Sequence, residues 1–129
     1  MKLLLDTHIW LWSLREPERL GRRVRRELAD SANELWLSPV STWEAFLLAR
    51  KGRILLHGDL TVWLARATRH LREAPLTHEI VLAAHQLSLP HPDPADRFLT
   101  ASAKVLGLTL VTADARLLGL GEIATLANR

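Results

Sequence analysis

The sequence predicts a three-layer α/β/α domain, in which helices cover both faces of a central, mainly parallel sheet of four to five short strands. The first observation behind this prediction is a series of short apolar runs, which are typical of strands buried on both faces. The second is that stretches with helical spacing separate these runs. The third is size: 129 residues, 48% of them hydrophobic, fit a single domain, residues 1–129, with a substantial core.

Five short segments are strand candidates. Residues 2–5 form an apolar run, and residues 34–37 form another that Ser38 and Pro39 end. Only a short strand fits around residues 74–76, between two helical patterns. Residues 108–111 form a third apolar run, and a last strand is expected near residues 122–124.

The helices follow from apolar residues at helical spacing and from residues that start or stop helices. Thr77 is placed to cap one helix, and Gly52 is placed to end another. Pro90, Pro92 and Pro94 predict a stiff loop. The expected helices are residues 7–14, 21–32, 41–51, 60–71, 78–87, 95–106 and 115–118.

Composition narrows the class of protein. There is no cysteine, which excludes disulfides and thiolate metal sites. No run reaches the roughly 18 apolar residues of a membrane span, and the first residues lack the pattern of a secretory signal. We therefore expect a soluble, cytoplasmic protein with no membrane association.

The net charge is only +3, but the basic residues are mostly arginines that gather in two segments. Guanidinium groups match phosphate oxygens, so such a surface is a candidate footprint for a nucleic acid. A solvated helix face in an arginine-rich protein explains the pattern as well. The clustered residues are Arg15, Arg19, Arg22, Arg23, Arg25 and Arg26, and then Arg50, Lys51 and Arg53.

Acidic residues stand where apolar runs give way to helices. Asp6 follows residues 3–5, Asp114 follows residues 108–112, and Glu44 and Asp96 lie at the starts of two other expected helices. Each acid has a structural explanation, because short acids cap helices and interact favourably with the helix dipole. Glu44 in particular is three residues after Ser41, which is the spacing of a capping box.

Taken together, the acids indicate a cation site. The carboxyl ends of parallel strands meet at one edge of a sheet, where ligands bind. Like charges that converge there repel unless a cation neutralises them. Oxygen ligands without cysteine favour Mg²⁺ or Mn²⁺. Zinc is disfavoured, because the six histidines lack the spacing of zinc ligands.

A carboxylate-held magnesium beside an arginine-rich surface favours phosphodiester hydrolysis by a metal-activated water. Thr7 and Thr112 flank the acids and could orient a water or a phosphate oxygen, although a hydroxyl that caps a helix is the simpler role for both. Arg97 could clamp a phosphate or pair with Asp93.

The ordered motifs resemble the PIN-domain ribonucleases, and more closely the VapC-type toxins of toxin–antitoxin systems. The matching stretches are Leu3-Leu4-Leu5-Asp6-Thr7-His8, Ser41-Thr42-Trp43-Glu44, Asp93-Pro94-Ala95-Asp96-Arg97-Phe98-Leu99 and Leu108-Thr109-Leu110-Val111-Thr112-Ala113-Asp114. They occur in the family's order and span nearly the whole chain. The resemblance implies a PIN-like α/β/α fold.

The resemblance also implies roles for individual residues. Asp6, Glu44, Asp96 and Asp114 would bind Mg²⁺ or Mn²⁺ for the cleavage of single-stranded RNA, with Asp93 as a helix cap or supporting residue. It further implies a cognate antitoxin that binds the active-site groove, and a toxin homodimer. The chain departs from the toxin subgroup at Ala95, where a bulky aromatic is usual, and at Pro92, where a basic residue is usual. These departures bear on loop shape and substrate choice.

Two other functions remain open at this point. A phosphoryl-transfer domain can have the same architecture, but a haloacid-dehalogenase-like phosphatase should carry an Asp at position 8, where this chain has His8. A receiver-like domain should carry a lysine after the late strand, and none follows Val111. The second alternative is a catalytically silent PIN fold that acts as a partner-binding module.

Overall fold

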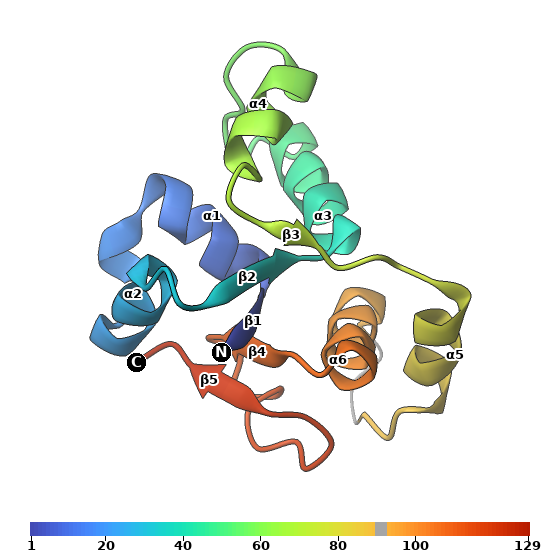
Figure 1. The fold of residues 1–129 in the computed structure, drawn as a ribbon. Helices are drawn as coiled ribbons and strands as arrows, with labels where there is room; N and C mark the ends of the chain where they lie inside the picture. The colour runs from blue at the N-terminus through green and yellow to red at the C-terminus, as the bar shows by residue number, and fades with distance from the viewer. Residues whose placement is uncertain (90–92) are drawn as a thin grey trace.

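The computed structural model describes residues 1–89 and 93–129 and has the expected architecture, a parallel sheet with helices on both faces (Figure 1). The strands are β1 (Lys2–Leu5), β2 (Glu34–Leu37), β3 (Arg72–Glu73), β4 (Thr109–Thr112) and β5 (Thr125–Ala127). The helices are α1 (Thr7–Arg15), the 3₁₀ helix η1 (Pro17–Arg19), α2 (Arg22–Ala29), α3 (Pro39–Arg50), α4 (Leu60–Ala67), α5 (His78–Gln86) and α6 (Pro94–Leu106).

The sheet has the order β3-β2-β1-β4-β5, and all of its pairings are parallel. β1 lies in the middle, where Leu4 is paired with Trp36 of β2 on one side and with Leu110 of β4 on the other. The connections therefore change direction between β1 and β4. In open α/β sheets, that switch point leaves a crevice at the carboxyl ends of the strands.

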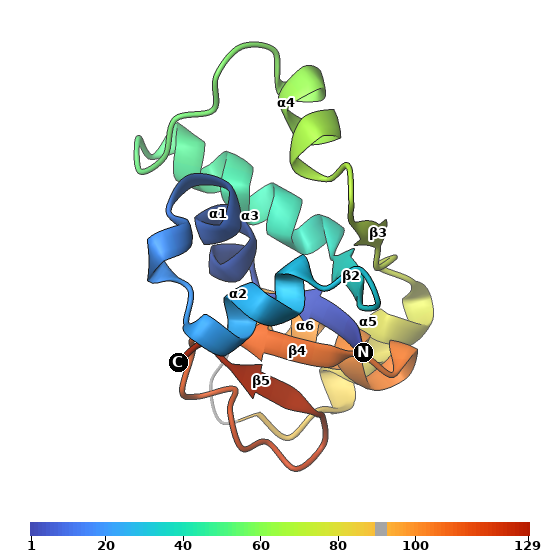
Figure 2. The ribbon, with the colours of Figure 1, turned by 60° about the vertical axis from the view of Figure 1, so that its left-hand side comes forward.

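Alternate side chains of β1 enter different cores. Leu3 and Leu5 pack with α1, α2 and α3 on one face, and Leu4 packs with α6 on the other. Figures 1 and 2 show α1 and α2 on one side of the sheet and α6 on the opposite side, with α5 packed outside α6. The buried Trp10 donates its indole N–H to Ala67 O at 2.9 Å, which ties α1 to the end of α4.

Most helices begin at a residue whose side chain accepts a backbone N–H, as the sequence pattern predicts. Asp93 caps α6 and is followed by Pro94 in the first turn, where the absence of an N–H is harmless. The capping side chains are Asp6 for α1, Ser38 for α3, Asp59 for α4, Thr77 for α5 and Asp93 for α6.

Helix α3 begins earlier than expected. Ser38 accepts from Val40 N at 3.1 Å and Pro39 occupies the first turn, so the helix starts before Ser41. Ser38 and Pro39, expected as the end of a strand, also have the preferences of a helix start. Ser41 therefore lies inside the helix, and the expected capping box with Glu44 is wrong. Two other helices end sooner than expected, α2 at residue 29 and α4 at residue 67.

Two of the expected strands and one of the expected helices also differ from the structure. β3 ends at Glu73 rather than spanning residues 74–76, because Pro75 has no N–H to donate to a neighbouring strand. The expected helix at residues 115–118 is a turn in which the Asp114 carbonyl accepts from Leu117 N at 3.0 Å. The last strand lies at residues 125–127 instead of 122–124, where Leu126 is paired with Val111.

The loop predicted from Pro90 and Pro92 lies outside the described residues. Among the residues that are described, none of the helices has both the length and the apolar character needed to cross a membrane.

Gly107 ends α6 in the left-handed region, with φ of 67°. We expect Gly107→Ala to lower the free energy of unfolding by about 1 kcal/mol, because a Cβ disfavours this conformation. Gly121→Ala is the matched control, since Gly121 has no positive φ and an added Cβ there would meet no atom within 4 Å. Urea denaturation followed by circular dichroism measures the free energy of unfolding of both variants. Equal losses would contradict a cost specific to the left-handed conformation of Gly107.

Candidate active site

The four predicted acids line one cavity at the carboxyl ends of β1 and β4. Its volume is about 310 Å³. The acids come from four separate segments, because Asp6 follows β1, Glu44 lies in α3, Asp96 lies in α6 and Asp114 follows β4. The lining residues are Asp6, Thr7, His8, Trp12, Glu44, Asp93, Asp96, Ala113, Asp114 and Arg116. The four acids therefore converge as the parallel-sheet topology predicts.

Asp6 both caps a helix and faces the cavity. Its Oδ1 accepts from Thr7 N at 2.8 Å, and its Oδ2 accepts from the Thr112 hydroxyl at 2.6 Å. Burial raises the pKa of Asp6, although these two hydrogen bonds stabilise its charged form and act in the opposite direction. The two oxygens thus bind to α1 and to the end of β4, which fixes the carboxylate between them.

Glu44 is held by hydroxyl groups rather than by its own helix. The Thr7 hydroxyl donates to Glu44 Oε1 and lies 2.8 Å from Ser41 Oγ. A hydroxyl has one proton, so Ser41 donates to Thr7 while Thr7 donates to Glu44. Burial raises the pKa of Glu44, opposed by the Thr7 hydrogen bond. Ser41 is a supporting residue that sequence reasoning assigned to a different role.

Asp93 and Asp96 lie at the start of α6 and have different environments. Asp93 Oδ1 accepts from Ala95 N at 3.0 Å, as expected for a helix cap. Asp96 is almost completely buried, with 8% of its surface exposed. Burial raises the pKa of Asp96 to about 7, and the negative charges of Asp93, Asp6 and Asp114 add to the effect.

Asp114 forms an ion pair that the sequence did not predict. Arg116 Nη2 lies 2.8 Å from Asp114 Oδ2, and Arg116 Nε donates to Asp114 Oδ1 at 3.1 Å. The same Nη2 is 3.6 Å from Asp96 Oδ2. Hydrogen bonding to Asp114 raises the pKa of Arg116. Its position two residues after Asp114, in the turn that follows β4, was the available sequence signal.

Thr112 connects Asp114 to Asp6. Its hydroxyl oxygen accepts from Asp114 N at 3.0 Å, while its proton goes to Asp6 Oδ2. Neither threonine caps a helix, so the simpler role considered for both is wrong: Asp6 caps α1, only a turn follows Thr112, and Thr7 and Thr112 each hold a carboxylate of the cavity through a side-chain hydrogen bond.

Arg97 lies away from these acids, and both roles considered for it were wrong. Its Nε donates to Ala84 O at 3.1 Å and its Nη2 donates to Leu87 O at 2.8 Å. Helix α5 packs against α6, and the last carbonyls of a helix lack partners within the helix. Arg97 therefore stabilises the end of α5 instead of clamping a phosphate or pairing with Asp93.

The donor chemistry of the cavity fits a hard divalent cation. Its ligand atoms are carboxylate oxygens, and burial raises the pKa of Asp6, Glu44 and Asp96, so a cation placed among them would stabilise their charged forms. In the described part of the chain, no three acidic or histidine side chains lie at the spacing of a formed metal centre. A cation would have to draw the carboxylates closer together.

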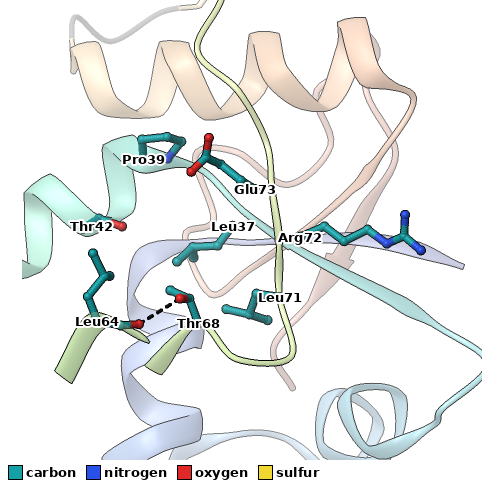
Figure 3. A pocket seen from close by; sticks show the side chains of 8 residues that line it. All are labelled: Leu37, Pro39, Thr42, Leu64, Thr68, Leu71, Arg72 and Glu73. Carbon is teal, nitrogen blue, oxygen red and sulfur yellow. Dashed lines mark hydrogen bonds between the residues drawn. The ribbon is translucent and has the colours of Figure 1, made fainter. Parts of the chain in front are cut away.

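A second hollow, between α3, α4 and β3, contains none of the predicted site residues (Figure 3). Its volume is about 250 Å³. The Thr68 hydroxyl donates to Leu64 O at 2.8 Å, and the side chain of Arg72 extends away from the other lining residues (Figure 3). This hollow offers no cluster of chemically reactive groups.

Comparisons with known proteins agree with this geometry. The PIN domain family model matches residues 3–123. Ribonuclease VapC22 of Mycobacterium tuberculosis is 35% identical over 116 residues, which cover 89% of this chain and 88% of that protein.

Solved structures support the fold. DNA-bound VapBC from Salmonella typhimurium matches with a TM-score of 0.74 at 15% identity, covering 98% of both chains. FitAcB from Neisseria gonorrhoeae matches with a TM-score of 0.72 at 23% identity, covering 98% of this chain and 97% of that one. The family match and the VapC22 match confirm the resemblance seen in the sequence motifs: the chain belongs to the PIN domain family and, within it, to the VapC type.

Proposed function

We propose that this protein is an Mg²⁺- or Mn²⁺-dependent endoribonuclease that cleaves single-stranded regions of RNA, and that it is the toxin of a type II toxin–antitoxin pair. The observation that carries the proposal is the convergence of four carboxylates from four segments on one cavity. The relative named as a ribonuclease, 35% identical, supports RNA as the substrate.

Asp6, Asp96 and Asp114, with Glu44, are the residues that would hold the cation. When bound, such an ion would supply an activated water and stabilise the charge on the leaving oxygen. Thr112 and Thr7 keep the carboxylates of Asp6 and Glu44 oriented for this task. Asp93 supports the site indirectly, because it caps the helix that carries Asp96.

The cognate antitoxin is the proposed protein partner. Structures similar to this chain include VapBC from Salmonella typhimurium and a toxin–antitoxin complex from Klebsiella pneumoniae. The toxin homodimer implied by the resemblance stays a prediction. A catalytically silent, partner-binding PIN fold is the alternative that the activity experiment below tests, and the PIN family match disfavours a separate phosphoryl-transfer domain.

Cleavage of a mixed, partly structured RNA pool by the antitoxin-free protein should require Mg²⁺ or Mn²⁺ and should stop with EDTA. We expect Asp6→Asn and Asp96→Asn each to lower the cleavage rate by more than the ~100-fold that loss of an outer supporting residue causes. Glu79→Gln, which changes an exposed acid on α5, is the matched control and should cleave normally. Equal rates for the wild type and both aspartate variants would refute the nuclease assignment.

Arg116 and a divalent cation should compete for the same carboxylate oxygens, because Arg116 contacts both Asp114 and Asp96. We expect Arg116→Ala to bind Mn²⁺ severalfold more tightly than the wild type in isothermal titration calorimetry. Arg72→Ala removes the same charge from a residue that is 3.6 Å from Glu34 and outside the cavity, so it should not change Mn²⁺ affinity. Unchanged or weaker binding by Arg116→Ala would argue against competition.

The raised pKa of Asp96 should make the metal-free protein less stable as the pH rises. Folded Asp96 has a pKa of about 7 against an ordinary value of 3.8, so the folded state holds this proton more tightly than the unfolded chain. The corresponding stability is complete below the ordinary value and is lost as the pH rises through the folded value. In EDTA, the melting temperature of the wild type should therefore fall relative to that of Asp96→Asn as the pH rises from about 5 to about 8. A constant difference would contradict the shift.

A further inference from the structure

A groove, distinct from the hollow of Figure 3, adjoins the acidic cavity and shares lining residues with it. It lies along α1 and η1 and is closed by the end of α3 and the residues that follow, with a volume of about 320 Å³. His8 and Trp12 line both spaces. The lining residues are His8, Leu11, Trp12, Arg15, Glu16, Arg19, Leu48, Arg53 and Ile54.

The groove is positively charged where the adjoining cavity is negative. Arg15, Arg19 and Arg53 line it, against the single carboxylate of Glu16. Glu16 accepts from Arg19 Nη1 at 3.2 Å, which uses one of five guanidinium N–H groups. None of the ion pairs found among residues 1–89 and 93–129 involves Arg53, whose side chain is exposed.

Contacts with neighbouring groups hold Arg19 and Arg15 in place. The Arg19 guanidinium lies 4.3 Å from the centre of the Trp12 ring, and the His8 ring stacks on Trp12 with a centroid distance of 5.7 Å. Arg15 Nη1 donates to Leu55 O, which fastens the segment after α3 to the end of α1. Groups that are ordered in advance lose less conformational entropy when a ligand binds.

The arginines that cluster in the sequence fall into two sets in the structure: those that line the groove and those on α2. The α2 arginines are exposed around the buried Val24, and they line neither the groove nor the acidic cavity. Arginine-rich composition alone explains the α2 set. It does not explain three arginines around one hollow that opens beside the candidate active site.

Resting on the nuclease function proposed above, we infer that this groove binds the phosphodiester backbone of the RNA strand next to the scissile phosphate, with Arg19 and Arg53 as phosphate contacts. A polyanion is repelled by the carboxylates of the cavity, so nearby basic groups are needed to attract it. The shared wall of His8 and Trp12 lets one strand pass from the groove to the acids. Arg15 is assigned to positioning the segment after α3, because its guanidinium is already bound to Leu55 O.

The test compares two double variants that remove equal charge. Arg19→Gln with Arg53→Gln alters the groove, and Arg23→Gln with Arg26→Gln alters α2. Each pair is combined with Asp96→Asn to prevent cleavage, and binding of a fluorescein-labelled single-stranded RNA of about 12 nucleotides is followed by anisotropy at increasing KCl. Thermal melting and Mn²⁺ titration of the two pairs without Asp96→Asn verify that the fold and the acidic cavity are intact.

We expect the groove pair to weaken RNA binding about tenfold at low salt and to reduce the slope of log affinity against log salt by roughly 1.4, the value for two phosphate contacts on a single strand. The α2 pair should change affinity less than about twofold. In cleavage assays with Asp96 intact, the groove pair should raise KM and leave kcat near the wild-type value.

Equal losses for the two pairs would overturn the inference, because binding would then depend on total charge alone. So would unchanged RNA binding by the groove pair together with lost binding of a poly-glutamate peptide, which would assign the groove to an acidic protein segment. If the wild type cleaves RNA but both pairs lose RNA affinity equally, only the role of the groove is refuted. If the wild type never cleaves RNA, the nuclease proposal itself is refuted.

Discussion

The burial of several carboxylates beside one another at the carboxyl ends of β1 and β4, reinforced by their mutual repulsion, is the constraint on which the rest of the site depends. Burial raises the pKa of Asp6 and Glu44 and moves that of Asp96 to about 7, so their charged forms are disfavoured in the absence of a cation. Within the described residues, Arg116 is the cation that lies among the acids. Its side chain remains 58% exposed, so solvent weakens its compensation of nearly buried charges. In the proposed function, a small divalent ion held by these carboxylates would supply further compensation.

The fold holds these charges together through hydroxyl groups. Thr112 joins the end of β4 to Asp6, and Thr7 joins the start of α1 to Glu44 and Ser41. Leu3, Leu4 and Leu5 of the central strand β1 are buried and β1 pairs on both sides, so the residues next to its end are fixed by the sheet. Side chains on such rigid elements keep their orientation at low entropic cost. Asp6 and Glu44 are therefore oriented before any ligand arrives.

The sequence predicted the parts of this arrangement that depend on local signals. Asp6, Asp93 and Asp114 stand directly after apolar runs or before a helix, and parallel-sheet topology brings such positions to one edge. What it missed depends on contacts between distant segments. Ser41 binds Thr7 of another helix, and Arg97 binds the end of α5 rather than the adjacent Asp93. Neither partner can be read from spacing, because both follow from how the helices pack.

The clustered arginines show why charge patterns need a structure before they can be assigned. In the sequence, Arg19 and Arg25 belong to one cluster and have equal standing as nucleic-acid contacts. In the fold, Arg19 is oriented on Trp12 beside the acids, whereas Arg25 lies on the solvent face of α2. A nuclease needs two opposite electrostatic environments side by side, since the acids that hold a cation also repel the substrate. His8 and Trp12 of α1 line both the acidic and the basic space, so the two environments adjoin along this helix. The proposed function and the proposed groove thus assign substrate attraction and cation binding to two neighbouring spaces that share His8 and Trp12.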